Sequence, residues 1–245
     1  VKPATAGEDG KAQDVPFKEG IKALFKNKYW IMMTGMLALF FLMYSVNGGA
    51  TVYYAKDILG DRNLVSTING IFNVVQILGM FFIAMLVKRL GKRNVFAIGL
   101  VLDIIGMLLL NFVGGSMAGI VVSSVIRGIG NACGGATMWA MVSDTIDYGE
   151  WKSGVNTAGT LSAVNGFVGK VGMAIASSIG AALLQIGGFD ANMAVQTTTA
   201  QHYITAMYIW VPIITNIATI ITMMFYDLDK IYPQIIKELD ERRAN

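Results

Sequence analysis

The chain has 245 residues, of which 54% are hydrophobic and 14% are charged. A soluble domain carries about 25% charged residues, so this composition argues against a disordered chain, a disulfide scaffold and most cytosolic enzymes. The net charge of +3 is too small to indicate a nucleic-acid partner, and one cysteine (Cys133) with one histidine (His202) cannot build a Cys/His zinc site. We therefore expect a membrane protein, not an enzyme, with no metal or cofactor of its own.

Long runs without a charged residue mark the expected membrane spans, because a helix needs about 20 apolar residues to cross the hydrocarbon core. Six spans are predicted, at residues 30–55, 65–87, 94–113, 117–143, 155–186 and 204–226. Only Gly114, Gly115 and Ser116 separate the third span from the fourth, which predicts an antiparallel hairpin. The expected fold is all-α: a polytopic six-helix bundle over residues 29–226, between a linker at 1–28 and a tail at 227–245.

Lysine and arginine are unevenly distributed over the connecting segments. The termini and the even-numbered connections carry fifteen of them, whereas the odd-numbered connections carry only Lys56 and Arg62. Because positive charge gathers on the cytoplasmic side, both termini are expected in the cytoplasm. The tail also has four apolar residues at helical spacing, Ile231, Ile235, Ile236 and Leu239. This spacing predicts an amphipathic helix on the inner membrane surface.

Two opposite charges lie deep within the third and fourth spans. Asp103 and Arg127 are each twelve residues from Gly115, which places both about 18 Å from the turn of the hairpin. An unpaired charge at that depth is costly, so the spacing predicts an ion pair between the two helices. In the alternative interpretation the guanidinium of Arg127 binds a substrate oxygen.

A third ionisable residue, Lys170, lies near the middle of the fifth span. It belongs to a helical stripe of mostly small residues: Gly159, Ser162, Gly166, Lys170, Met173 and Ser177. Small residues favour close helix packing, but a lysine in a dry contact has no solvation. We therefore expect a cavity wall, with an acidic partner that another part of the protein supplies.

Amide side chains recur on the second span at Asn69, Asn73 and Gln76, spaced four and three residues apart. Amides offer both donors and acceptors, which suits hydroxyl-rich ligands. One interpretation places them on the same polar cavity as Lys170, and the other gives them hydrogen bonds to neighbouring helices. The sequence leaves both open.

The segment after the fourth predicted span carries a specific motif. It reads Asp144-Thr145-Ile146-Asp147-Tyr148-Gly149-Glu150-Trp151-Lys152, which we call the signature segment. It resembles the signature of the glycoside–pentoside–hexuronide:cation symporter family, within the major facilitator superfamily. Further matches include Gly159, Ser162, Phe167, Lys170 and Gly172. Many members carry an arginine shortly after the signature, where this chain has Val155-Asn156-Thr157-Ala158.

The resemblance implies that the six spans are helices seven to twelve of a twelve-helix symporter in a bacterial inner membrane. An amino-terminal half, absent from this sequence, would then supply acidic residues for the coupling cation, Na⁺ or H⁺, and much of the sugar site. Lys170 would be the polar contribution of this half beside those acids. Asp144, Asp147 and Tyr148 would lie at the cytoplasmic gate.

The favoured function is cation-coupled symport of a sugar or glycoside by alternating access between two bundles. A proton-coupled carrier of another small polar solute remains an alternative, as does a six-span structural or regulatory subunit. The polar residues of the second and fifth spans argue against the subunit, since a purely structural bundle needs no lysine at that depth.

Overall fold

The structure, a computed structural model, describes residues 21–22, 24–113, 116–154 and 158–244, with no β-strand among them. Six membrane-competent spans are present in this part of the chain. Five of them are α2 (Lys28–Tyr53, continued by the π-helix η1, Tyr54–Ile58), α3 (Leu64–Leu90), α4 (Lys92–Val113), α5 (Met117–Ser153) and α6 (Ala158–Ile186). The sixth combines α7 (Thr198–Thr205), the π-helix η2 (Ala206–Trp210) and α8 (Val211–Met224). The predicted all-α six-helix architecture is confirmed.

The fourth span differs from its predicted range of 117–143. α5 continues for ten further residues to Ser153, so the signature segment is helical, and its placement in a connection was wrong. After residue 143 no glycine or proline occurs before Gly149, and the helix ends at Gly154, whose φ of 70° favours glycine. Charged residues mark the end of the apolar stretch here, and they do not mark the end of the helix.

Parts of several predicted features lie outside the described residues. These are most of the linker at 1–28, the first two glycines of the hairpin turn, and residues 155–157 where many family members carry an arginine. The third residue of the turn, Ser116, caps α5 by accepting a hydrogen bond from the Gly119 amide at 3.1 Å.

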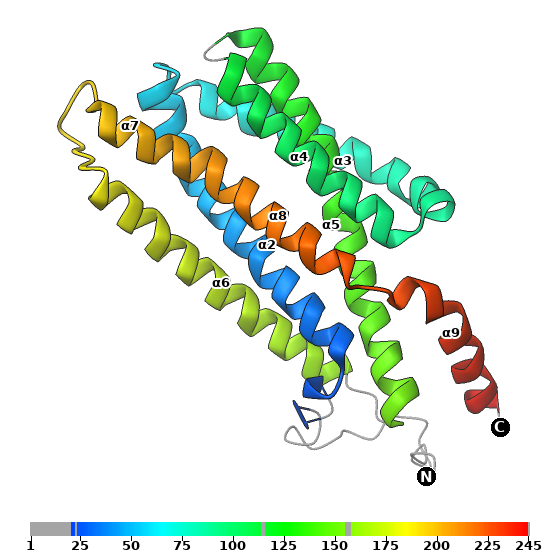
Figure 1. Ribbon diagram of the computed structural model, residues 1–245. Coiled ribbons are helices and arrows are strands. Elements are labelled where there is room, and N and C mark those ends of the chain that lie inside the picture. Colours follow the sequence, from blue (N-terminus) through cyan, green and yellow to red (C-terminus); the bar gives the residue numbers. More distant parts are fainter. Residues whose placement is uncertain (1–20, 23, 114–115, 155–157, 245) are drawn as a thin grey trace.

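The helices form two groups, α2 with α6 and α8, and α3 with α4 and α5, which meet where α4 packs on α8 and α5 packs on α2 (Figure 1). α2 packs between α6 and α8, while α5 packs against both α3 and α4. α4 and α5 approach so closely that a Cβ atom added at Gly99 would lie 2.6 Å from the carbonyl oxygen of Gly130. Glycine at both positions allows this contact between backbones, which brings the charges of the two helices together.

α3 and α6 are the least covered spans. Within the most apolar stretch of each, 6% and 17% of the residues are buried, whereas the other four spans range from 39% to 61%. A span with so little burial needs another apolar surface around it, either lipid or protein. The exposed faces of α3 and α6 are therefore the surfaces through which the chain contacts lipid or another protein segment.

The tail forms a helix, α9 (Leu228–Ala244), that packs against the end of α5 (Figure 1). Ile235 and Leu239 are 1% and 3% exposed and belong to the same apolar cluster as Tyr148 of α5. The indole Nε1 of Trp151 donates to Glu238 at 2.6 Å, and this hydrogen bond lowers the pKa of the carboxyl. The helix was predicted, but its apolar face packs on protein, because the extended α5 offers a surface outside the membrane.

Candidate functional site

The two buried charges of the hairpin form an ion pair. Arg127 Nε lies 3.3 Å from Asp103 Oδ1, and the two residues are 4% and 5% exposed. α4 and α5 run antiparallel from the turn, so equal spacing from it brings the two side chains to the same depth. The pair expected from the sequence is therefore present.

The pair is the centre of a larger network. Arg127 Nη1 donates to the hydroxyl of Tyr208 at 2.9 Å and Nη2 to Asn47 Oδ1 at 2.8 Å, while Asp103 Oδ2 accepts from Asn216 Nδ2 at 2.8 Å. Asn47 Nδ2 also donates to the Tyr208 carbonyl oxygen at 3.0 Å. The network joins α2, α4, α5, η2 and α8, and it gives all three guanidinium nitrogens and both carboxylate oxygens a partner. Such complete pairing is what a buried charge pair requires.

A cavity of about 190 Å³ opens beside this network. Its walls come from α2, α3, α4, α5 and η2, and they include Asn47, Thr51, Asn69, Phe72, Asn73, Asp103, Arg127, Asn131 and Tyr208. The guanidinium carbon lies 5.6 Å from the centre of the Phe72 ring and 5.3 Å from that of Tyr208. We call this cavity the polar pocket.

The three amides of the second span divide between the two interpretations. Asn69 and Asn73 are exposed and line the polar pocket, and Asn73 Nδ2 donates to the Asn69 carbonyl oxygen at 2.7 Å. Gln76 Nε2 instead donates to Asn131 Oδ1 at 2.7 Å, an interhelical hydrogen bond from α3 to α5. Asn131 also lines the pocket, so Gln76 is linked to the pocket through this hydrogen bond.

Lys170 lies apart from the polar pocket. It is exposed on α6, it is not among the pocket-lining residues, and it has no ion-pair or hydrogen-bond partner in the part of the chain that the structure describes. α6 packs on α2 through the neighbouring stripe, where Cβ atoms at Gly169 and Gly172 would lie 3.1–3.3 Å from Phe41. Within this chain Lys170 therefore does not line the polar pocket, because packing turns the lysine away from α2, and the expectation of a cavity shared with the amides stays a prediction.

The signature segment forms a second polar cluster at the other end of α5. Asp144 Oδ1 accepts from Lys92 Nζ at 2.6 Å, and Asp147 accepts from the Tyr232 hydroxyl at 2.7 Å. The ring of Tyr148 is buried, with its centre 4.7 Å from that of Tyr29 in an edge-to-face contact. All three expected gate residues thus lie together, and both carboxylates have partners within this chain.

Comparison with known proteins places this architecture in a family. The family described as MFS/sugar transport protein matches residues 2–230. The chain belongs to this family. It is 33% identical over 95% of its length to the isoprimeverose transporter of Lactiplantibacillus pentosus, and 30% identical to both a putative sulfoquinovose importer (90% of the chain) and a glucuronide carrier protein homolog (91% of the chain) of Escherichia coli K12.

The chain spans about half the length of these curated relatives, covering 48%, 48% and 49% of them. With six membrane-competent helices it corresponds to half of a major facilitator fold, in a multi-pass membrane protein. Sites of such transporters lie near the midplane, and the polar pocket is at the depth of the buried ion pair.

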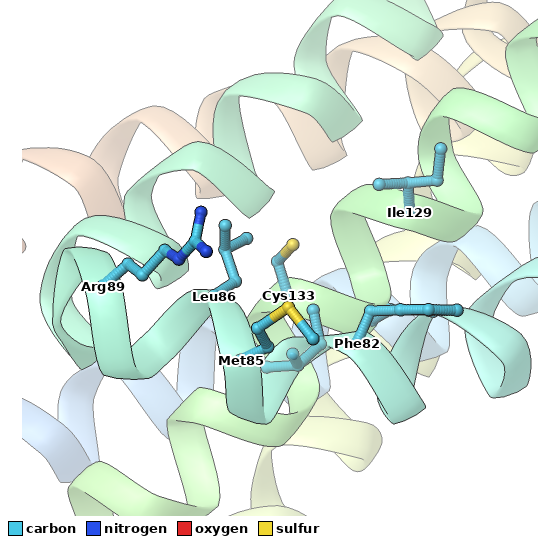
Figure 2. Close-up of a pocket in the computed structure, with 9 residues that line it drawn as sticks. Phe82, Met85, Leu86, Arg89, Ile129 and Cys133 are labelled. Carbon is cyan, nitrogen blue, oxygen red and sulfur yellow. The ribbon is translucent and has the colours of Figure 1, made fainter.

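A larger cavity of about 360 Å³ lies between α3 and α5 (Figure 2). Its walls are apolar apart from Arg89, which stands at one end while Phe82 lies toward the other. A sugar site needs several polar groups that converge, and this groove lacks them. Among the described residues no group of three or more His, Cys, Asp or Glu side chains could hold a metal ion.

The sequence indicated Asp103 and Arg127 but not Asn47, Tyr208 or Asn216. Each of the three missed residues is an ordinary polar or aromatic residue within an apolar span. A polar residue in a membrane helix is a signal in itself, so the two asparagines could have been marked. Their convergence on the Asp103–Arg127 pair depends on the packing of residues that are 80–113 positions apart in sequence.

Proposed function

We propose that this chain is the carboxy-terminal half of a cation-coupled symporter of a sugar or glycoside. The coupling ion is Na⁺ or H⁺, and transport proceeds by alternating access around a site at mid-membrane depth. The observation that carries the proposal is the polar pocket, which combines a neutralised buried ion pair with exposed amides. Relatives named for isoprimeverose, sulfoquinovose and glucuronide support a sugar-like substrate.

The polar pocket supplies one side of the site. Its volume of about 190 Å³ is below the range of about 300–1,000 Å³ for small-molecule sites. Residues of the amino-terminal half, facing the poorly covered α3 and α6, would complete it. In this arrangement the exposed Lys170 of α6 lies opposite acidic side chains of that half, which gives a lysine within a span the partner it needs.

The signature segment would act at the cytoplasmic gate. Asp144 and Asp147 are satisfied within the chain, by Lys92 and by Tyr232. Both carboxylates therefore keep these partners while the cytoplasmic side is open. To close that side, residues of the other half would have to replace Lys92 and Tyr232 or bind beside them. The excess of lysine and arginine at this end orients both termini to the cytoplasm of a bacterial inner membrane.

Reconstitution of the full-length protein tests the proposal. Proteoliposomes with an inward Na⁺ or H⁺ gradient would receive the 4-nitrophenyl glycosides of glucose, galactose and xylose, as both anomers, with the matching glucuronides and galacturonides. At least one compound should accumulate above its external concentration, and an ionophore that dissipates the driving gradient should abolish the accumulation. The proposal is overturned if none of these compounds enters, or if entry is indifferent to both gradients.

Lys170→Ala in the same protein should abolish gradient-driven accumulation while membrane insertion persists. Without the ammonium, acidic residues across the cavity lose a compensating charge, which favours their neutral form and weakens their hold on a cation. Lys237→Ala is the matched control, because Lys237 is an exposed lysine of α9 outside the spans. Normal accumulation by Lys170→Ala would show that this lysine has no part in coupling.

A further inference from the structure

The charged groups at the polar pocket are already committed to each other. Among the residues that line the pocket, only Asp103 and Arg127 carry charge, and together they sum to zero. Every nitrogen of the guanidinium donates to a protein acceptor at 2.8–3.3 Å, and both carboxylate oxygens accept. Nη1 and Nη2 each keep one further N–H group, but Arg127 is only 4% exposed and Asp103 balances its charge, so a ligand that enters the pocket meets little of this cation.

The polar groups that remain available in the pocket are neutral. Asn69 and Asn73 expose amides on α3, and Asn131 keeps an Nδ2 group whose companion oxygen accepts from Gln76. Tyr44 adds an exposed phenol to the same wall. Amides and phenols exchange hydrogen bonds with sugar hydroxyls in either direction.

An anionic sugar would be opposed at this site. Its carboxylate or sulfonate would have to approach the remaining N–H groups of Arg127 beside the carboxylate of Asp103, or displace Asp103, Tyr208 or Asn47 from the guanidinium. The first outcome brings two anions together, and the second leaves a buried charge or acceptor without its partner, which is costly in a site that excludes water. Lys170 offers no remedy here, because it lies outside the pocket on α6.

We infer that the polar pocket selects uncharged glycosides over sugars that carry a carboxylate or sulfonate. This inference rests on the proposed function and narrows its substrate class. Selection comes from the closed Asp103–Arg127 network, which hides the only cation of the pocket. Neutral hydroxyl-rich ligands need none of these bonds to break and can pair with the free amides.

Matched glycosides test the inference in proteoliposomes of the full-length protein. 4-Nitrophenyl glucoside and galactoside differ from the corresponding glucuronide and galacturonide only at C6, where a hydroxymethyl group replaces a carboxylate. The better-transported neutral compound should enter at least about tenfold faster than its uronide. A smaller preference, or a preference for the uronide, overturns the inference while the proposed function stands. If no compound enters, the proposed function itself fails.

Two variants connect the preference to the network. Asp103→Asn removes the counter-ion and gives the pocket a net positive charge, so the ratio of neutral to uronide uptake should fall at least about fivefold. The double variant Asp103→Asn with Arg127→Gln returns the net charge to zero and should continue to exclude uronides. An unchanged ratio in a correctly inserted Asp103→Asn protein overturns the inference. If that variant does not fold, the matched glycosides in the wild-type protein still decide the question.

Discussion

Removal of one partner from the buried ion pair should cost at least as much stability as removal of both. Asp103→Asn leaves a guanidinium without its counter-ion, and Arg127→Gln leaves a carboxylate with Asn216 as its one remaining partner among the residues that the structure describes. Each residue is at least 95% buried, so each single substitution should lower the free energy of unfolding by about 3–5 kcal/mol. The double variant strands no charge and loses hydrogen bonds only, so its cost should stay near 3 kcal/mol.

These values predict a coupling energy of at least about 3 kcal/mol between the two positions. The assay is reversible SDS-induced unfolding of the purified full-length protein in mixed micelles, followed by circular dichroism. Asp103→Asn combined with Thr222→Ala is the control cycle, because Thr222 bonds only the Ala218 carbonyl of its own helix. That control should be additive within about 0.5 kcal/mol. Equally additive costs for the Asp103–Arg127 cycle would refute the reasoning that the pair acts as one unit.

Three further predictions concern packing, acid stability and the tail. Gly99→Ala should destabilise the protein by about 1–3 kcal/mol, because its Cβ would lie 2.6 Å from a carbonyl oxygen of α5. Gly35→Ala, whose Cβ would have nothing within 4 Å, should leave the stability unchanged, and thermal unfolding of the two variants tests this. The Tyr29 hydroxyl donates to Asp227 at 2.5 Å and lowers the pKa of that carboxyl, so the stabilisation is complete above the unfolded-state pKa of about 3.9 and is lost as the pH falls through the lower folded value. Tyr29→Phe should thus destabilise the protein at pH 7, and its deficit should shrink below about pH 4; a constant deficit would contradict this linkage. Trp151→Phe removes the hydrogen bond to α9 and should hasten trypsin cleavage of the tail in inside-out vesicles. An unchanged cleavage rate would show that other contacts alone hold α9.

Hydrophobic length and charge placement were sufficient to predict the number of spans and one contact between them. The Asp103–Arg127 pair was predictable because a short hairpin fixes the relative depth of two residues by counting along the helices. The end of α5 was not, because helix continuation depends on backbone propensity, and charged residues outside the hydrocarbon do not interrupt it.

The rotation of a helix about its own axis was harder to predict from the sequence. Lys170 and the stripe of small residues around it suggested a cavity wall, and that stripe is exposed in this chain, whereas Gly169 and Gly172 of the neighbouring stripe pack on α2. Small residues lie on both faces of α6, so their spacing could not decide which face is covered. Asn47 and Tyr208 were missed for a related reason, since only the packing of α2 and η2 against α5 brings them to Arg127.

Substrate protection of a pocket residue tests the central claim most directly. In a cysteine-free version of the full-length protein, Asn73→Cys would be alkylated with a small maleimide in the presence and absence of the transported glycoside. Val74→Cys, on the next residue of α3 and outside the pocket lining, is the matched control. The account predicts that saturating glycoside slows alkylation at position 73 several-fold and leaves position 74 unchanged. Equal alkylation rates at position 73 with and without glycoside would contradict it, because the substrate would then pass elsewhere.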